Sequence, residues 1–496
     1  MAQILYNSTR GKEKNIDASL AIVKGLANDG GLFVPSYIPR ISTDLEKLCS
    51  MDYKTLAYEI MKEYLSDFTD QELRYCIDSA YDDKFDTKEI APLVKKGEDF
   101  YLELFHGATI AFKDMALSIL PYFMITSLKK QSINNEVVIL TATSGDTGKA
   151  ALAGFADVEG TKIIVFYPKD GVSPIQKHQM VTQKGNNTAV VGIEGNFDDA
   201  QNAVKEIFND IEFNKQINKE GYQFSSANSI NIGRLVPQIV YYFYAYSSLV
   251  NKKEIGIGDN MNVVVPTGNF GNILAAYYAK EMGLPIGKLI CASNTNKVLY
   301  DFISSGTYNR KRDFELTISP SMDILISSNL ERLIYLLTGS DTIETARLMK
   351  ELSENGEYTI SEKMKKGLED FVGGYASDQE TMDTIKKVYE ESDYLIDTHT
   401  AVGKAVYDKY KEQANDTTKT IIASTASPYK FTRSVMLAID QEYDRYTDFE
   451  LIKKLKEVSN VDIPPAIQEI LNAEVIHNME CKKEEIKQVV VKILQK

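Results

Sequence analysis

The sequence predicts an α/β protein built on parallel sheets, with helical segments at both ends of the chain. Runs such as EVVILTA, KIIVFYP and NVVVP are short, apolar and rich in β-branched residues. Each run is followed by turn residues and then by a helical pattern. Continuous apolar strands that alternate with helices are typical of parallel βαβ units, in which helices cover both faces of the sheet.

The first section of the chain, to about residue 95, predicts mainly helices. Residues 17–27 have apolar side chains at helical spacing, and Asp17 is a candidate N-cap. The segment 29–40 is rich in turn residues, and 44–82 is expected to be helical with a polar face. This section is therefore predicted to be a small helical domain.

The middle of the chain carries the expected sheets. Strands are expected at 136–142, 162–168, 188–193, 262–266, 288–293 and 419–424. Helices are expected from about 147, from 173, from about 198, over 229–250 and after the turn that follows residue 266. Residues 320–415 are expected to be mostly helical, and so is the tail from about 449, with a break at Pro464 and Pro465.

These patterns divide the chain into three parts. An N-terminal domain is expected over 1–95, a catalytic core over 96–430 and a C-terminal helical segment over 431–496. Within the core, a smaller subdomain is expected at about 115–220. In sheets of this kind, ligands bind at the carboxyl ends of the strands, so the glycine-rich turns there are the candidate functional sites.

Composition and charge restrict the classes of partner. The 496 residues include 56 Lys and Arg and 70 Asp and Glu, so the formal net charge is -14. This balance disfavours nucleic acid and anionic membrane surfaces as partners. The four cysteines form no C-x-x-C pair, the four histidines do not cluster, and no apolar run reaches signal-peptide or membrane-spanning length. We therefore expect a cytoplasmic protein with no metal site.

Two glycine-rich turns are candidate anion sites. Thr267 to Asn272 (TGNFGN) follows a strand and precedes a helix, which allows either a phosphate cradle or an ordinary tight βα turn. Thr143 to Lys149 (TSGDTGK) has the same position relative to another strand. A nucleotide P-loop is disfavoured there, because the glycine spacing is too short and Ala150 replaces the magnesium-binding hydroxyl. An anion-binding turn for a carboxylate or a phosphate fits better.

Three further segments carry reactive or polar side chains. Lys113 lies in a mostly apolar stretch, where an amine loses its proton easily and suits a Schiff base, although a single lysine is usually a surface residue. The segment 226–234 ends in Arg234, which could bind phosphate or could simply follow an N-cap cluster. Thr425 follows a strand, and helix capping explains Ser427 but not Thr425.

Taken together, these segments resemble the threonine synthase family, in its longer microbial and fungal form. Eight segments match in order: GLFVP, ELFHGATIAFKD, LTATSGDTG, SANSINIGRL, PTGNFGN, ASNTN, DTHTAVG and STASPYKF. The resemblance implies a fold-type II, tryptophan-synthase-β-like enzyme that uses pyridoxal 5'-phosphate (PLP). It also implies conversion of O-phospho-L-homoserine and water to L-threonine and phosphate.

The resemblance assigns roles by position. Lys113 would be the Schiff-base lysine and the proton carrier. The residues that would bind the cofactor are Gly268, Asn269, Phe270, Gly271 and Asn272, around its phosphate, and Thr425, at its pyridine nitrogen. The residues that would bind substrate are Ser144, Gly145, Asp146 and Thr147, at its carboxylate, and Asn228, Ser229 and Arg234, at its phosphate. The chain departs from the family pattern at Ala108, Asn272, Lys297 and Thr398.

Other functions remain open from the sequence. One is another fold-type II PLP lyase, such as a threonine or serine dehydratase, or a sulfhydrylase. The Arg234 group argues against these enzymes, since they need no clamp for a substrate phosphate. The others are a catalytically inactive binding protein, disfavoured by Lys113 and the glycine cradle, and an NTP-binding protein, disfavoured by the spacing of SGDTGK. We expect a monomer or a homodimer.

Overall fold

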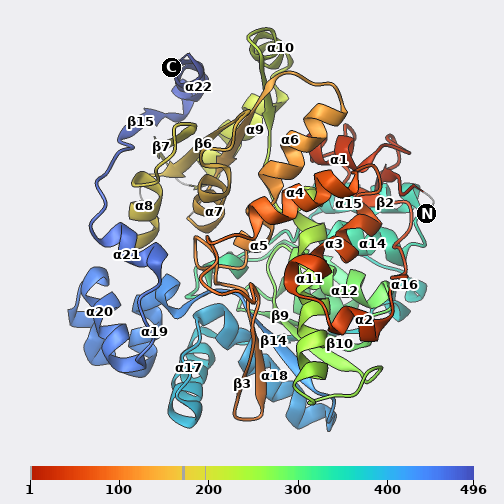
Figure 1. Ribbon diagram of the computed structural model, residues 1–496, viewed down its shortest axis with the longest axis vertical. Coiled ribbons are helices and arrows are strands. Elements are labelled where there is room, and N and C mark those ends of the chain that lie inside the picture. The colour runs from red at the N-terminus through yellow and green to blue at the C-terminus, as the bar shows by residue number, and fades with distance from the viewer. Residues whose placement is uncertain (1–2, 144, 170–171, 173, 196, 496) are drawn as a thin grey trace.

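The computed structural model contains two parallel sheets, each flanked by helices, in the upper and lower parts of Figure 1. It describes residues 3–143, 145–169, 172, 174–195 and 197–495. Within these residues, no helix is both long enough and apolar enough to cross a membrane. The predicted α/β class with two parallel-sheet subdomains is confirmed.

The large sheet lies in the lower half of the molecule. Its strands, in spatial order, are β13 (Phe371–Tyr375), β10 (Ile286–Ser293), β9 (Met261–Pro266), β14 (Thr420–Ser424), β4 (Asp99–Glu103) and β3 (Leu93–Lys96). All neighbours are parallel except the β3–β4 hairpin. In this register Ile422 of β14 lies beside Val264 of β9 and Tyr101 of β4, so the carboxyl ends of these strands meet at one edge.

The small sheet lies in the upper half and is parallel throughout. Its strands, in spatial order, are β15 (Met479–Lys482), β7 (Thr188–Glu194), β6 (Thr161–Pro168), β5 (Glu136–Ala142) and β8 (Tyr222–Ser225). Two antiparallel pairs lie outside both sheets: β1 (Tyr6–Ser8) with β2 (Phe33–Pro35), and β11 (Thr307–Asn309) with β12 (Glu357–Thr359).

The helices fall into four groups along the chain. The first group is α1 (Ala18–Lys24), α2 (Leu45–Cys49), α3 (Tyr53–Tyr64), α4 (Asp70–Ala80), α5 (Asp114–Leu117) and α6 (Leu120–Lys130). The small-sheet group is α7 (Asp146–Phe155), α8 (Pro174–Val181), α9 (Phe197–Asn209) and α10 (Ile211–Lys219). The large-sheet group is α11 (Ile232–Asn251), α12 (Gly271–Glu281), α13 (Val298–Ser305), α14 (Leu330–Leu337), α15 (Thr342–Asn355), α16 (Glu362–Lys366), α17 (Asp378–Ser392) and α18 (Thr398–Ala414). The last group is α19 (Thr432–Ile439), α20 (Asp448–Ser459), α21 (Pro465–Leu471) and α22 (Ile486–Leu494), and the 3₁₀ turns are η1 (Pro320–Met322), η2 (Pro428–Phe431), η3 (Gln441–Arg445) and η4 (Lys483–Glu485).

The long helix α11 packs against α3 on one side and α12 on the other. It begins at an N-cap, Asn231, whose side chain accepts from the backbone N–H of Gly233 (2.9 Å) and donates to the carbonyl of Ile22 (2.9 Å). The cap thus fixes the start of α11 to α1, and this start carries the Arg234 group.

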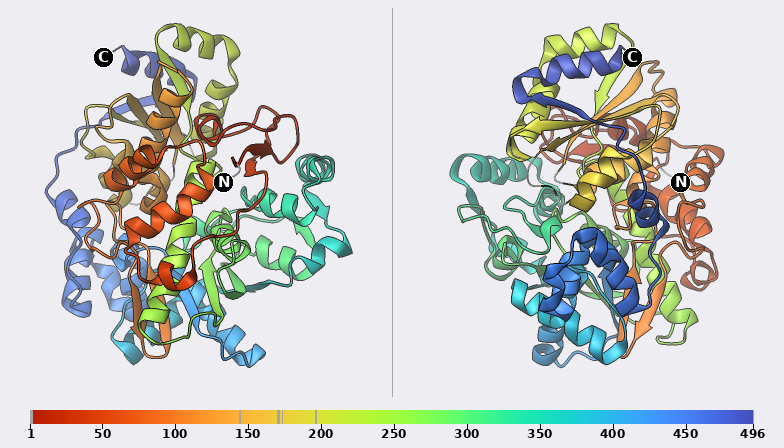
Figure 2. Two further views of the ribbon diagram at one scale, coloured as in Figure 1. Left: turned by 45° about the vertical axis from the view of Figure 1, so that its right-hand side comes forward. Right: turned by 90° about the vertical axis from the view of Figure 1, so that its left-hand side faces the viewer.

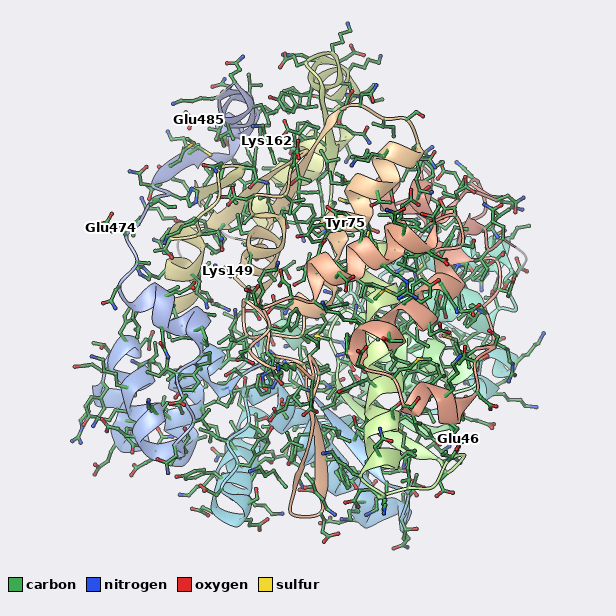
Figure 3. The ribbon with its side chains drawn as sticks, in the orientation of Figure 1. Glu46, Tyr75, Lys149, Lys162, Glu474 and Glu485 are labelled. Atoms are coloured by element: carbon green, nitrogen blue, oxygen red, sulfur yellow. The ribbon has the colours of Figure 1, made fainter. Side chains whose placement is uncertain are left out.

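The C-terminal tail differs from the all-helical expectation. After α21 the chain runs from the lower to the upper half of the molecule, as the right view of Figure 2 shows. Glu474, labelled in Figure 3, lies on this connection. The chain then adds β15 to the edge of the small sheet, where Cys481 pairs with Ile193 and is buried. Such a short strand beside charged residues gives no clear period-2 pattern, so the sequence did not reveal it.

Two strands also interrupt the region expected to be mostly helical. These are β12 and β13, and β13 has the sequence FVGGY. A Cβ added at Gly374 would lie 2.4 Å from Cγ1 of Val406, so helix α18 packs directly on the strand backbone. The glycines that this approach requires also weaken the strand pattern in the sequence.

Helices α5 and α7 are in close contact through Gly154. A Cβ added there would lie 2.2 Å from the carbonyl oxygen of Leu117. We expect Gly154→Ala to lower the free energy of unfolding by about 1–3 kcal/mol, since the two helices must separate. Urea denaturation of the apoprotein measures this. Gly271→Ala is the control, because the φ of Gly271 is not positive and the Cβ added there would lie 3.5 Å from the nearest packed atom. An equal loss in both variants would show that the contact is relieved without separating the helices.

Candidate active site

The Lys113 backbone is fixed at the carboxyl edge of the large sheet. The N–H of Phe112 donates to the carbonyl of Thr425, just after β14 (2.8 Å). The buried carboxylate of Asp114 accepts from the N–H (2.8 Å) and the hydroxyl (2.6 Å) of Thr109. These bonds close the loop before α5 and leave the Lys113 side chain in the interior between the two sheets.

The Lys113 amine is nearly enclosed. Its side chain is 11% exposed, and its Nζ lies 3.4 Å from Oδ2 of Asp146 and 3.3 Å from Oγ of Ser321. Nζ also lies 5.0 Å from the centre of the Phe112 ring. Burial lowers the pKa of Lys113, and the carboxylate of Asp146 only partly opposes this effect. The amine is therefore easily obtained in the uncharged form that forms a Schiff base.

Asp146 is the first residue of helix α7 and belongs to the predicted turn over 143–149. Its carboxylate accepts from Nε2 of Gln176 (2.9 Å) and from Oγ of Ser321 (3.0 Å), and it pairs with Lys430 (3.2 Å) as well as Lys113. Burial alone would raise the pKa of Asp146, but the ammonium groups of Lys430 and Lys113 hold it well below its usual range. Asp146 is therefore ionised at neutral pH.

The hydroxyl of Thr143 accepts two backbone hydrogen bonds from the segment 143–149. The N–H groups of Gly145 and Gly148 both donate to this hydroxyl, each at 3.0 Å. Thr147 lies in the first turn of α7, whereas Ser144 lies outside the described residues. The amine of Lys149, a residue labelled in Figure 3, donates to Oε1 of Gln183.

The TGNFGN turn connects β9 to α12, as predicted. Phe270 adopts a left-handed conformation (φ 64°) and α12 begins at Gly271. A Cβ added at Gly268 would lie 2.5 Å from the carbonyl oxygen of Ser321, so only glycine fits there. The carbonyl of Asn269 accepts from the backbone N–H (3.1 Å) and the side chain (3.0 Å) of Asn329. The first N–H groups of a helix have no partner within that helix, so the start of α12 makes this turn suitable for a phosphate.

Asn272 supplies a donor to the same turn. Its Oδ1 accepts from the hydroxyls of Tyr241 (2.7 Å) and Tyr242 on α11. Its Nδ2 is buried and has no hydrogen-bond partner within the described part of the chain. A buried donor without a partner is costly, so the site fits an anionic group that accepts this bond. The cradle residues therefore fit the phosphate of PLP.

The Arg234 group lies at the start of α11. The Arg234 side chain is buried; Nη1 donates to the carbonyl of Ala227 (2.7 Å), whereas Nε is buried without a partner among the described residues. Burial lowers the pKa of Arg234 to about 10, which leaves the guanidinium charged at neutral pH. Ser229 accepts from Nδ2 of Asn329 (3.5 Å), the residue that also holds Asn269, whereas Asn228 is exposed. This group therefore adjoins the cradle.

Thr425 is buried at the end of β14. Its N–H donates to the hydroxyl of Thr400 (3.3 Å), and its carbonyl accepts from Phe112. The same backbone thus positions both Thr425 and the residue next to Lys113. No group of three or more His, Cys, Asp or Glu side chains within the described residues could hold a metal ion.

The structure adds residues to which the sequence analysis gave no role. Ser321 links the Gly268 turn to Lys113 and Asp146, and its N–H donates to Nε2 of His399 (3.0 Å). Nδ1 of His399 lies 2.8 Å from Asp397, so the proton is assigned to Nδ1. Lys430 pairs with Asp146. His399 and Lys430 lie within the matched segments DTHTAVG and STASPYKF, which could have indicated a role. Ser321 lies in η1 and Asn329 just before α14, and no matched segment includes either residue.

A buried lysine of lowered pKa, a glycine turn that suits a phosphate and two parallel-sheet subdomains together define a PLP-dependent enzyme of fold type II. Comparison with known proteins agrees. Residues 93–425 match the model of the pyridoxal-phosphate dependent enzyme family. Residues 5–81 match "Threonine synthase N terminus", and residues 400–490 match "Threonine synthase, C-terminal". The chain belongs to the threonine synthase family, and its cofactor is PLP.

Individual relatives cover most of the chain. Threonine synthase of Schizosaccharomyces pombe is 38% identical over 476 residues, which cover 89% of this chain and 91% of the relative. The human threonine synthase-like 1 protein is 41% identical over 434 residues, which cover 85% of this chain; the chain spans only 58% of that relative's length. The crystal structure of PLP-bound threonine synthase from Brucella melitensis has a TM-score of 0.88 and 34% identity, and the match covers 99% of each chain. These findings confirm the family, the fold class and the cofactor predicted from the sequence.

Proposed function

We propose that the protein converts O-phospho-L-homoserine and water to L-threonine and phosphate. The observation that carries this proposal is the Arg234 group beside the PLP cradle. A buried guanidinium whose Nε has no partner among the described residues suits a second phosphate, that of the substrate. A dehydratase or a sulfhydrylase needs no such clamp. The family membership supports the same reaction.

Each segment of the site has a proposed task. Bound PLP supplies an aldehyde for the Schiff base and an electron sink for the reaction. Lys113 forms that Schiff base and, when free, moves protons at the α and β carbons of the substrate. The turn from Gly268 to Asn272 holds the cofactor phosphate, and Thr425 donates to the pyridine nitrogen. These assignments are supported by the burial of Lys113 and by the unpaired Nδ2 of Asn272.

The substrate contacts complete the proposal. Ser144, Gly145, Asp146 and Thr147 hold the substrate carboxylate, chiefly through N–H groups at the start of α7. Asn228, Ser229 and Arg234 hold the substrate phosphate, which leaves from Cγ, and water then adds at Cβ. A hydroxyl at Thr425 stabilises a charged pyridinium less than a carboxylate would, which limits side reactions at the α carbon.

The proposal extends to the setting of the enzyme. We propose a cytoplasmic enzyme with a small-molecule substrate that acts as a monomer or homodimer and has no nucleic-acid or membrane partner. The net charge of -14 supports the absence of nucleic acid. The four cysteines are buried and unpaired, which suits a reducing compartment.

The PLP-loaded protein should release phosphate and threonine in equal amounts from O-phospho-L-homoserine. We expect Arg234→Met to lower kcat/KM for this substrate by about 10- to 100-fold, mainly through KM, because a charged hydrogen bond to the phosphate is lost. The measurement is phosphate release together with amino-acid analysis. Arg234→Lys, which keeps the charge, should lose less.

The dehydratase alternative is tested in the same assay. L-threonine and L-serine are supplied to the wild-type enzyme, and 2-oxo acids are measured. Faster formation of 2-oxo acid from these substrates than of threonine from O-phospho-L-homoserine would contradict the proposed function. An Arg234→Met variant with unchanged KM would remove the residue from the phosphate clamp.

A further inference from the structure

The site contains a second buried ammonium group, that of Lys430. Lys430 lies in η2, just after β14, and its side chain is 0% exposed. Its Nζ lies 3.2 Å from Oδ1 of Asp146, 3.2 Å from the carbonyl of Thr109 and 3.3 Å from Oε1 of Gln179. These partners belong to α7, to the loop before Lys113 and to α8, so one ammonium joins both subdomains around the reactive lysine.

Asp146 is shared between two lysines. Its Oδ1 faces Lys430 at 3.2 Å and its Oδ2 faces Lys113 at 3.4 Å. The charged and titratable groups that act on this cluster are Arg234 on Lys113, His399 on Asp146, and Asp114 and Lys149 near Lys430. Around Lys113 the nearby cations, Lys430 and Arg234, therefore outnumber the facing carboxylate, Asp146.

We propose that Lys430 is a positioning residue that holds and neutralises Asp146, so that Lys113 works as an uncharged amine. Because its side chain is fully buried, Lys430 acts through Asp146 and not on the substrate. This inference deepens the proposed function and rests on the assignment of Lys113 as the Schiff-base lysine.

If Lys113 were the only cation beside Asp146, the carboxylate would act on the protonation of Lys113 in two ways. A carboxylate next to one lysine in a buried site stabilises the ammonium form of that lysine and raises its pKa. A buried carboxylate also needs a counter-ion when that lysine loses its proton. Lys430 meets both needs: it shares the carboxylate while Lys113 is charged, and it remains as the counter-ion when Lys113 is neutral. Its own charge further disfavours the ammonium form of Lys113.

The test is a pH titration of the holoenzyme. Visible absorbance reports protonation of the Schiff-base nitrogen. The value of kcat, which reports the enzyme–substrate complex in which Lys113 is a free amine, is measured over the same pH range. In Lys430→Met we expect the absorbance midpoint and the acidic limb of the kcat profile to move to higher pH by about one unit, a tenfold rise in proton affinity. The midpoint rises for two reasons. A nearby positive charge is removed, and Asp146 then pairs only with the Schiff-base nitrogen.

Three further variants separate charge from structure. Lys430→Arg keeps the charge and should restore the wild-type midpoint. The double variant Asp146→Asn with Lys430→Met removes both charges and should return the midpoint toward the wild-type value. Lys430→Gln keeps an N–H donor for the Thr109 carbonyl, and it replaces the methionine variant if that variant does not fold. Failure of the arginine variant to restore the midpoint would overturn the proposal.

Lys404→Met is the matched control. Lys404 is also mostly buried, and it pairs with Asp99 (3.1 Å) and Asp408. Asp99 begins β4, so this pair lies at the amino ends of the strands, opposite the cluster. Its removal should leave the midpoint unmoved, and an equal shift would overturn the proposal. Loss of activity in Lys430→Met with an unmoved midpoint would show a structural role only. Absorbance that persists in Lys113→Ala would instead overturn the assignment of Lys113, which separates the two failures.

Discussion

Replacement of Lys113 by alanine is expected to remove the visible absorbance of the PLP-loaded protein and to lower kcat for threonine formation by at least about 10³-fold. The reason is local. Lys113 Nζ is the amine that the fold places beside Asp146 and Ser321, with a pKa lowered by burial. Lys430 cannot take its place, because its Nζ is held by Asp146 and the Thr109 carbonyl. Absorbance spectra after reconstitution with PLP, together with phosphate release, measure both effects.

Lys149→Ala is the matched control for this result. Lys149 is a second amine near the site, and burial together with Lys430 lowers its pKa to about 8. A low pKa alone would therefore make it a competing Schiff-base lysine. Its Nζ is engaged by Gln183, so we expect Lys149→Ala to keep the absorbance. Loss of absorbance in Lys149→Ala, with retention in Lys113→Ala, would reverse the assignment.

The strands that sequence reasoning found include several that are buried on both faces, but it missed β4, in which four of five residues are buried, and the short β8. β5, β6 and β9 are continuous apolar runs, and their predicted and observed bounds agree to within a residue or so. β15 and β13 were missed for different reasons. β15 is a short edge strand with charged residues, and β13 carries glycines that α18 requires for close packing. In both strands the extended conformation is stabilised by tertiary contacts, and the local sequence pattern does not indicate it.

The candidate site shows the same division. The turns after β5, β9 and β14 were identified from the sequence, because glycine and hydroxyl residues at the end of a buried strand form a local signal. Ser321 and Asn329 were not identified, since no matched segment includes them and their roles arise from contacts across the chain. Lys430 was overlooked because a lysine is rarely fully buried, and only the fold shows Asp146 beside it.

The acidic exterior does not conflict with two phosphoester ligands. The formal net charge is -14, yet the anion sites are two helix N-termini together with two buried cations, Arg234 and Lys430. Binding at such sites depends on short-range hydrogen bonds in a low-dielectric interior, which salt screens weakly. The surface charge therefore bears on the choice of macromolecular partners and hardly on the affinity for a small phosphorylated amino acid.

Gly268→Ala is expected to damage both the cradle and the loop that carries Ser321. The added Cβ would lie 2.5 Å from the Ser321 carbonyl oxygen, which is backbone and cannot rotate away. The Gly268 carbonyl also accepts a hydrogen bond from the hydroxyl of Ser327 (2.7 Å), so a shift of the turn would break this hydrogen bond as well. We expect a loss of about 1–3 kcal/mol in the free energy of unfolding of the apoprotein. We also expect at least about a tenfold weaker affinity for PLP, since the N–H groups at α12 are displaced.

Gly271→Ala gives the comparison that isolates this contact. Gly271 lies in the same turn, but its added Cβ would meet no atom closer than 3.5 Å. The free energy of unfolding of its apoprotein should therefore not fall below that of the wild type, because the added Cβ meets no close atom and alanine is a better helix former than glycine. Only the PLP affinity of this variant should change, and only if the cofactor phosphate closely approaches the turn. Urea denaturation and absorbance titration with PLP measure the two quantities separately. Equal stability of the Gly268→Ala and Gly271→Ala apoproteins would show that the segment around Ser321 shifts at little cost. That segment would then not fix the position of the cradle relative to Lys113 and Asp146.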